Sequence, residues 1–270
     1  MIKPKRRFRV PVYAECLSPD RFADRSVKEI MKFEVWEGNK KRPLGDLFEI
    51  HGEAADSPEN LTLQISGDLR KVRMIGCGMT GGKILIDGDV GMHLGERMQG
   101  GEILVNGNVD SWAGCMMSGG KIEVKGSAGD YLGAPYRGSR NGLKGGSIIV
   151  HGDVGNEAGC FMRGGVIKIY GNARDFVGIH MMGGEILVAG NCQDRAGAGM
   201  IDGKIVICGH VSSILPTFTI EEIRKSVKVN GEKIAGPFYR FSGDIADQGQ
   251  GRLYVAKERN PHLRFYEEYL

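Results

Sequence analysis

Long apolar runs, clustered cysteines and a strong net charge are all missing from this chain of 270 residues. No apolar stretch reaches the ~18 residues that a membrane helix needs, and no charged start followed by an apolar core marks a signal peptide. The net charge of +3 does not favour nucleic acid or a membrane surface as a partner. We therefore expect a cytoplasmic protein that binds neither nucleic acid nor membrane.

Clustered metal ligands and catalytic motifs are also missing. None of the six cysteines forms a Cys-x-x-Cys pair, whereas iron–sulfur and structural zinc sites usually gather their ligands at short spacing. Free thiols in a reducing compartment fit this pattern better than disulfides do. No His-Glu-x-x-His, Gly-x-Ser-x-Gly, P-loop or dinucleotide-binding motif occurs. We expect no catalytic, cofactor-binding or metal-binding residue in this chain.

Glycine, by contrast, is abundant and periodic. Of the 43 glycines, 35 lie between residues 61 and 210, about three times the average usage of about 7%. One glycine per repeat recurs at steps of 21, 19, 19, 26, 19, 19 and 19 residues, at Gly67, Gly88, Gly107, Gly126, Gly152, Gly171, Gly190 and Gly209. A fixed period near 20 is typical of a solenoid.

Each repeat contains one strand pattern and no helical periodicity. Apolar, mostly β-branched residues alternate ahead of the first glycine, as in Ile84/Ile86 and Ile205/Ile207. The sequence therefore predicts an all-β fold: a right-handed parallel β-helix, a solenoid of about eight coils with a 19-residue repeat. Stacking would align equivalent residues into columns. One column of methionines should fill the interior, and a column of Asp, Asn and Ser should bond backbone groups at the turns.

Both ends of the chain differ in composition from the repeat, which predicts small α/β caps. We expect three parts: residues 1–46 as a helix and hairpin cap, 47–211 as the β-helix, and 212–270 as a C-terminal cap with a docking tail. Within them, Ser18 and Pro19 should start a short helix, and Thr219 should cap another. The basic first ten residues are expected to form a solvated tail.

Two features suggest a contact with a partner. Trp112, Tyr131 and Phe176 occupy one column, which should face outward. The 26-residue coil carries an insertion, and insertions in solenoids often line a binding face. This loop, residues 134–143, contains Tyr136, Arg137 and Arg140. The alternatives are that terminal segments of the same chain cover the aromatic column, and that the loop has no role.

A different class of function, a β-helix enzyme acting on acidic glycans, would need acids and basic residues together on one face. Candidates for such a face scatter over the corners: Asp110, Asp130, Asp175 and Asp194, with Arg174 and Arg195 nearby. Charges of this kind are usually solvated, so we treat this function as the lesser alternative.

The repeat, with its paired glycines and methionines, resembles the GXGXG β-helix at the end of the glutamate synthase large subunit. Several stretches spanning residues 43–243 are more similar still to the C subunit of formylmethanofuran dehydrogenase. They are "PLGDLFEIHGEAADSPE", "MIGCGMTGG", "GDYLGAPYRGSRNGLKGG", "GIHMMGG", "SILPTF" and "PFYRFSGD". A related formyltransferase/hydrolase complex of methylotrophs has a similar subunit.

The resemblance implies a place in an enzyme complex that reduces CO2 and forms formylmethanofuran, the first step of methanogenesis from CO2. In that family the chemistry lies in other subunits. One binds a tungsten or molybdenum pterin and an iron–sulfur cluster, another is amidohydrolase-like with a binuclear metal site, and further subunits carry iron–sulfur clusters. The subunit that this chain resembles is implied to be a rigid rod without a cofactor of its own, against which the others pack.

Overall fold

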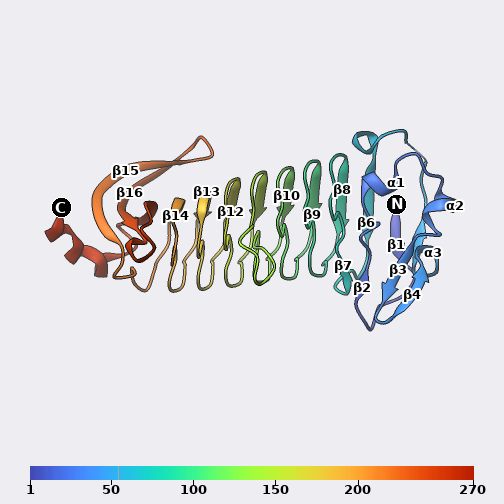
Figure 1. Cartoon of the computed structure of the whole chain (residues 1–270), viewed down its shortest axis with the longest axis horizontal. Coiled ribbons are helices and arrows are strands. Elements are labelled where there is room, and N and C mark those ends of the chain that lie inside the picture. Colours follow the sequence, from blue (N-terminus) through green and yellow to red (C-terminus); the bar gives the residue numbers. More distant parts are fainter. Residues whose placement is uncertain (54) are drawn as a thin grey trace.

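The computed structural model describes residues 1–53 and 55–270 and shows a rod of stacked coils, with the two chain ends at opposite ends of the rod (Figure 1). One parallel strand per coil follows the next along the rod. These strands are β6(Thr62–Ser66), β8(Lys83–Asp87), β9(Glu102–Val105), β10(Lys121–Val124), β11(Ser147–Val150), β12(Val166–Ile169), β13(Met182–Val188) and β14(Asp202–Ile207). The predicted all-β solenoid of about eight coils is confirmed.

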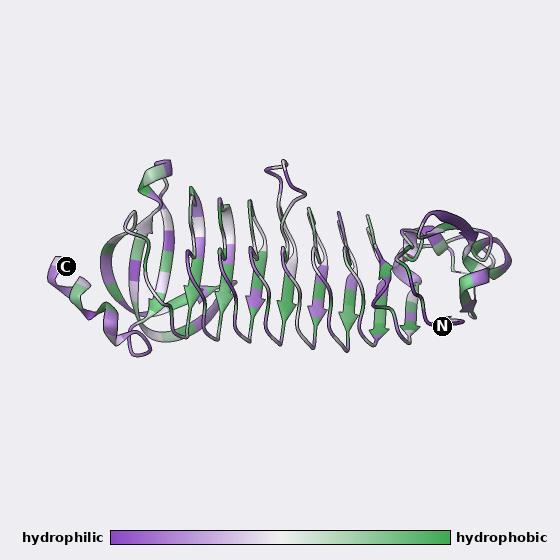
Figure 2. Ribbon diagram, turned by 90° about the horizontal axis from the view of Figure 1, so that it is seen from below, coloured by the Kyte–Doolittle hydropathy of each residue, from purple (hydrophilic) through white to green (hydrophobic). Residues whose placement is uncertain are grey.

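The strands stack in register, so that each isoleucine lies directly above its equivalent in the next coil. Ile84 pairs with Ile103, and Ile103 with Ile122. A second column of single parallel bridges runs from Leu69 to Val211. Alternate strand residues point inward and are buried, and the strands of the middle coils show green apolar segments interrupted by purple polar ones (Figure 2). The hydrophobic core is therefore a continuous column along the axis of the rod.

The two predicted side-chain columns are confirmed. The methionine column is wholly inside, at 0% exposure, and comprises Met79, Met98, Met117, Leu143, Met162, Met181 and Met200. The polar column connects neighbouring coils: the backbone N–H of Asn108 donates to Asp89 Oδ1 at 2.8 Å, and that of Asn191 to Asn172 Oδ1 at 2.9 Å. Each of these side chains thus satisfies a backbone donor one coil further on.

The N-terminal cap contains short helices and two sheet segments. Its elements are β1(Ile2–Pro4), β2(Val12–Tyr13), α1(Pro19–Phe22), α2(Val27–Ile30), β3(Glu34–Glu37), β4(Lys40–Pro43), α3(Leu44–Leu47), β5(Phe48–Ile50) and the 3-10 helix η1(Pro58–Asn60). The short strand β7(Val72–Arg73), in the first coil, pairs with β2. The helix at Pro19 and the β3–β4 hairpin agree with the sequence prediction.

The expectation of a solvated basic tail is wrong. β1 pairs with β6 in parallel and with β5 in antiparallel fashion, and Ile2 is only 1% exposed. Apolar residues are interspersed among the basic ones, and burial of Ile2 and Phe8 holds the segment against the sheet. Because β1 covers the strand that begins the stack, it protects an edge that would otherwise be open.

The C-terminal cap is a long β-hairpin that returns to the sheet. Its elements are β15(Thr219–Val229), β16(Glu232–Gly243), the 3-10 helix η2(Ile245–Asp247), β17(Gly251–Ala256) and the 3-10 helix η3(Pro261–Tyr269). β17 lies parallel to β14, and β16 and β15 follow in antiparallel order. Among the described residues, no helix is long and apolar enough to cross a membrane.

The helix predicted to begin at Thr219 is wrong, because this segment is strand β15. The spacing of Ile220, Ile223 and Val227 imitates a helical period. In the structure, register shifts between Ile220 and Glu222 and between Arg224 and Ser226 mark irregularities in the pairing. A bulge adds a residue and changes which side chains face the core. Accordingly, Ile220 and Ile223 pack against the main core, whereas Val227 packs with Leu187 and Val206 in a second cluster.

The sheet crosses both boundaries that the sequence suggested. β1 and β5 extend it beyond the first coil, and β5, which resembles the repeat strand in sequence, runs antiparallel to β1. β17, β16 and β15 extend it beyond the last coil. The division into 1–46, 47–211 and 212–270 therefore stays a proposal about domains.

Candidate functional site around the inserted loop

The aromatic column owes its geometry to an unusual backbone conformation. His93, Trp112, Tyr131 and Phe176 have φ values between 62° and 64°, in the left-handed region that glycine favours. At each coil this conformation turns the backbone sharply two residues before the second glycine of the repeat. Because the same turn is stacked coil upon coil, the side chains emerge one above the other.

The rings at the N-terminal end of this column stack on each other. The centroids of His93 and Trp112 lie 5.4 Å apart with an interplanar angle of 9°, and those of Trp112 and Tyr131 lie 4.5 Å apart at 14°. The guanidinium of Arg137 lies over the Tyr131 ring at 6.0 Å, and its Nη2 donates to the Tyr131 hydroxyl at 3.1 Å. Stacked rings and a cation over the last one hold these half-buried side chains in fixed positions.

The inserted loop projects from the middle of the rod (Figure 2) and is attached to the coils on both sides. Towards the N-terminus, the Tyr136 hydroxyl donates to Glu96 Oε2 at 2.6 Å. Towards the C-terminus, Arg163 Nε donates to the backbone oxygen of Arg140 at 3.0 Å. The loop is therefore anchored to the rod on both sides, and Tyr136 remains 37% exposed.

Beneath the loop lies a buried carboxylate, Glu96, which is 2% exposed. His93 Nδ1 is 3.1 Å and Arg97 Nε 3.7 Å from its oxygens. Burial raises the pKa of Glu96, but polar contacts with His93 and Tyr136 and the charge of Arg97 outweigh burial and hold this pKa below its usual value. The carboxylate is therefore ionised at neutral pH.

Removing the Tyr136 hydroxyl tests how much this contact contributes. We expect Tyr136→Phe to lower the free energy of unfolding by about 1–3 kcal/mol at neutral pH, because a buried carboxylate loses a donor. The pKa of Glu96 is lower in the folded than in the unfolded protein. The ionised carboxylate therefore contributes to the free energy of unfolding above the usual carboxyl pKa, and this contribution is lost as the pH falls through the folded pKa. Urea unfolding of both proteins between pH 7 and pH 3 should show the difference shrinking in acid. A difference that stays constant across this range would contradict the prediction.

The structure brings four of the six predicted contact residues together: Trp112, Tyr131, Tyr136 and Arg137 lie in one cluster, which we call the loop cluster. Arg140 lies at the other side of the loop. Phe176 lies further along the column, where the guanidinium of Arg195 is 5.3 Å from its ring. Partner binding by any of them stays a prediction.

Sequence reasoning missed the polar base of the loop cluster. Glu96 occupies a column that otherwise holds small or apolar residues: Cys77, Cys115, Ala134, Cys160, Ile179 and Ala198. The single charged residue in this column was the one feature of the sequence that could have indicated a polar site there. The contact between Glu96 and Tyr136 could not be inferred, because it depends on how the insertion folds.

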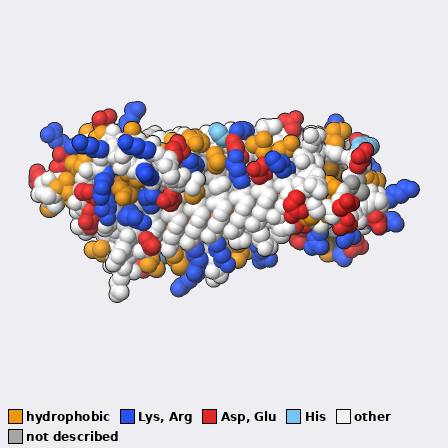
Figure 3. Space-filling model, turned by 90° about the horizontal axis from the view of Figure 1, so that it is seen from above, with side chains coloured by type: hydrophobic (Ala, Val, Ile, Leu, Met, Phe, Trp, Pro, Cys, Tyr) orange, Lys and Arg blue, Asp and Glu red, His pale blue; other side chains and the backbone are white. Residues whose placement is uncertain are grey.

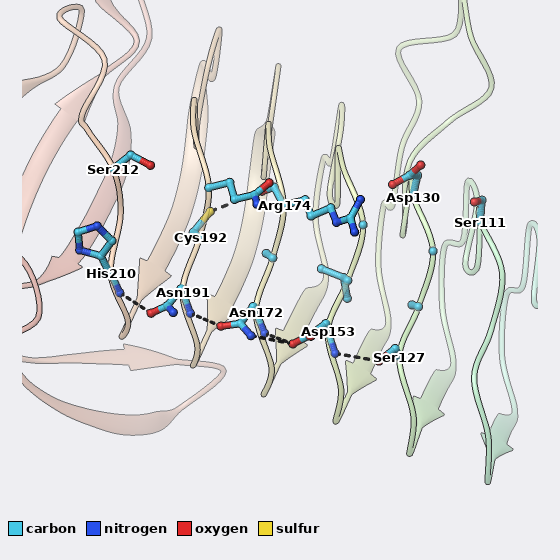
Figure 4. Close-up of a pocket in the computed structure, with 16 residues that line it drawn as sticks. Ser111, Ser127, Asp130, Asp153, Asn172, Arg174, Asn191, Cys192, His210 and Ser212 are labelled. Carbon is cyan, nitrogen blue, oxygen red and sulfur yellow. Dashed lines mark hydrogen bonds between the residues drawn. The ribbon is translucent and has the colours of Figure 1, made fainter.

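A second surface, the polar groove, follows the Asp/Asn column along the rod and has a volume of about 690 Å³ (Figure 4). Its side chains mainly serve the backbone: Asn172 and His210 donate their backbone N–H groups to Asp153 Oδ1 and Asn191 Oδ1, at 2.6 and 2.9 Å. Two of the four acids considered for a glycan enzyme do the same: Asp130 Oδ1 accepts from the backbone N–H of Asn156 and Asp175 Oδ1 from that of Asp194. Asp110 Oδ1 accepts from the adjacent Ser111 N–H. These contacts give the carboxylates a structural role.

Charged side chains gather over the two ends of the rod on the face that Figure 3 shows. Across the middle coils this face displays mostly backbone and uncharged side chains. Charged side chains border this strip in the same view. The outer face of the strands carries others, such as Lys83 and Glu102, so the uncharged surface is confined to a central strip of this face.

Comparison with known proteins gives strong similarities, although no family model matches the chain. It is 58% identical, over 97% of its length and 98% of the relative, to the C subunit of the tungsten-containing formylmethanofuran dehydrogenase 2 of Methanothermobacter thermautotrophicus. Against the corresponding subunit of Methanococcus maripaludis the identity is 53%, over 94% of this chain and 95% of that one. The C subunit of a molybdenum-containing formylmethanofuran dehydrogenase 1, from Methanothermobacter marburgensis, is 45% identical over 35% of this chain and 23% of its own length.

The fold also matches a solved structure. The crystal structure of the formyltransferase/hydrolase complex from Methylorubrum extorquens, in complex with methylofuran, contains a chain that superposes with a TM-score of 0.82. The two chains are 28% identical, and the match covers 94% of this chain and 98% of that one.

Proposed function

The chain belongs to the family of formylmethanofuran dehydrogenase C subunits, and from this premise we propose that it is the structural, non-catalytic subunit of such a complex. The complex reduces CO2 and forms formylmethanofuran, so the chain belongs to an oxidoreductase without performing the redox step. The single observation that carries this proposal is the 58% identity over nearly the whole of both chains.

The packing and hydrogen bonding of the rod support a structural role. The core is a continuous column of buried isoleucine, valine and methionine, and backbone bonds join every coil to the next. Two acids at the corners, Asp130 and Asp175, accept from backbone N–H groups of the following coil. Such a stack is stiff over its whole length and can hold large subunits at fixed separations.

The partners we propose are a pterin-binding catalytic subunit, an amidohydrolase-like subunit and iron–sulfur subunits, in the cytoplasm. Tungsten or molybdenum, iron–sulfur clusters and a binuclear metal site would all belong to those subunits. The relatives that match over nearly the full chain are named as tungsten-containing. Shorter matches, over 35% of this chain, include both a tungsten-containing and a molybdenum-containing relative.

Within the proposed complex, the loop cluster is the contact through which a partner subunit is positioned along the rod. Its aromatic rings and the Arg137 guanidinium are held rigidly, so little side-chain entropy is lost on docking. Aromatic residues and arginine are also the residue types that contribute most binding energy in protein interfaces.

Purification of the native complex through a tag on this chain tests both the non-catalytic role of the chain and the contact through the loop cluster. The catalytic subunits should co-purify, and the isolated chain should show neither CO2 reduction nor formyl transfer. Arg137→Glu should weaken recovery of one partner by about tenfold or more, since it puts an acid into a desolvated contact. Activity in the isolated chain would contradict the non-catalytic role.

A charge reversal away from the loop provides the control. Lys83 lies at the start of β8 on the outer face of the strands, with its side chain 57% exposed. Lys83→Glu should leave recovery of the partners unchanged. Equal losses for Lys83→Glu and Arg137→Glu, or no loss for either, would show that the loop cluster is not the contact.

The formyltransferase/hydrolase complex is the second candidate, favoured by the structural match to the Methylorubrum extorquens complex. A tagged purification decides between the two as well. Recovery of tungsten or molybdenum with the complex supports the dehydrogenase, whereas formyl transfer without either metal supports the second candidate.

A further inference from the structure

Three potential metal ligands converge beneath the inserted loop. His93 Nδ1, a carboxylate oxygen of Glu96 and Cys115 Sγ all lie within 4.8 Å of one another. Glu96 and Cys115 occupy the same position in consecutive coils, 19 residues apart, and His93 lies three residues before Glu96. Glu96 is 2% and Cys115 0% exposed, so the group is enclosed by the protein rather than spread over its surface.

The histidine is held in place, and the only polar contact of its inward nitrogen among the described residues, with Glu96, is poorly directed. Stacking on Trp112 fixes the imidazole plane. Nδ1 is buried and 3.1 Å from Glu96 Oε2, yet within the described part of the chain it makes no well-directed hydrogen bond. Buried ring nitrogens normally have a partner, so this one calls for a bound group. A cation between the nitrogen and the carboxylate would satisfy both.

We propose that His93, Glu96 and Cys115 form a zinc-binding site beneath the inserted loop, a site independent of the metals carried by other subunits. A thiolate, an imidazole nitrogen and a carboxylate oxygen are all established zinc ligands. Tetrahedral zinc places its ligand atoms roughly 3.5 Å apart, so side-chain shifts of about 1 Å complete the site. Three protein ligands leave one position open.

Tyr136 is the positioning residue of this site. Its hydroxyl donates to Glu96 Oε2 at 2.6 Å and so orients the carboxylate from outside the ligand set. Because Tyr136 lies in the inserted loop, zinc and the loop stabilise the same arrangement of Glu96. Zinc binding therefore rigidifies the loop cluster.

Binding exchanges one proton for the metal. Burial, followed by the charge of Glu96, raises the pKa of the Cys115 thiol to about 12, so the thiol is protonated in the metal-free protein. Zinc binds the thiolate, the S–H proton passes to solvent, and no electron is transferred.

The chain contains a matched control. Cys160 occupies the column of Cys115, is 7% exposed, and has its pKa raised by burial to about 12 as well. One coil before Cys160, however, Ala134 stands where Glu96 stands before Cys115, and Tyr131 stands where His93 does. Cys160 therefore has the burial of Cys115 without the carboxylate and the imidazole.

Titration of the reduced full-length chain with Co²⁺, a spectroscopic substitute for zinc, tests the proposal. We expect one Co²⁺ per chain, a thiolate-to-cobalt band in the near ultraviolet, and displacement by Zn²⁺. Cys115→Ser should abolish the band and weaken binding at least about a hundredfold, whereas Cys160→Ser should leave both unchanged.

Glu96→Gln provides a second variant should Cys115→Ser fail to fold, and it should weaken Co²⁺ binding while far-UV circular dichroism stays that of the parent. The proposal is overturned if no stoichiometric Co²⁺ is bound, if the spectrum lacks a thiolate band, or if Cys160→Ser loses the band as Cys115→Ser does.

Discussion

Gly119→Ala is expected to lower the free energy of unfolding by about 3 kcal/mol or more, although it adds a single methyl group. A Cβ at Gly119 would lie 2.1 Å from the backbone oxygen of Gln99 in the preceding coil. Gly119 has no positive φ, so the whole effect comes from this steric clash. Backbone hydrogen bonds hold the two coils together at this point, and neither can move without disturbing the next.

Gly138→Ala separates this clash from ordinary glycine strain. Gly138 has φ +87°, and a Cβ there would meet nothing within 4 Å. Its replacement should cost only about 1–2 kcal/mol, the usual penalty for a left-handed residue with a side chain. Thermal and urea unfolding of the two variants would decide the matter. Equal destabilisation, or a Gly119→Ala protein as stable as the parent, would mean that the coils are not packed as tightly as described.

The repeat could be predicted from the sequence because, in a stacked fold, equivalent positions of successive coils have the same surroundings and therefore need similar residues. From Gly100 onward, a Cβ at the first glycine of a Gly-Gly pair would clash with a backbone oxygen of the preceding coil, as at Thr80 for Gly100 and at Gln99 for Gly119. The column ends at Asp202, where the register between β13 and β14 shifts beside Met182. The repeat period was therefore sufficient to predict the fold of the coils. Outside the repeat, predictions were wrong at the bulged strand β15 and at the N-terminal strand β1.

The candidate site could be predicted only in part. The column of Trp112 and Tyr131 follows from the period, because equivalent residues of neighbouring coils must lie together. The positions of Tyr136 and Arg137 do not, because the inserted loop has no equivalent in other coils. The sequence was searched for metal ligands that lie close together along the chain. This search could not find Glu96 and Cys115, because a solenoid brings residues 19 apart in sequence into neighbouring coils.

Met117→Ala is expected to lower the free energy of unfolding by about 2–5 kcal/mol, because it opens a cavity in the centre of the rod. Met117 is 0% exposed, and its Cε lies 2.8 Å from the place where Gly146 would carry a Cβ. Met98 and Met162 fill the corresponding space beside Gly120 and Gly184. The methionine methyl occupies the space that a side chain at the second glycine of the next pair would fill, so truncating Met117 leaves that space empty.

Met117→Leu is the matched control, and it should cost less than about 1.5 kcal/mol because the volume is nearly conserved. Leu143 already occupies the methionine column one coil further on and is 0% exposed, so the interior accepts a branched side chain of this size. Urea unfolding followed by far-UV circular dichroism should separate the two variants clearly. Equal stability of Met117→Ala and Met117→Leu would show that the coils close over the missing side chain. The rod would then be a compliant scaffold, unable to hold partner subunits at fixed separations.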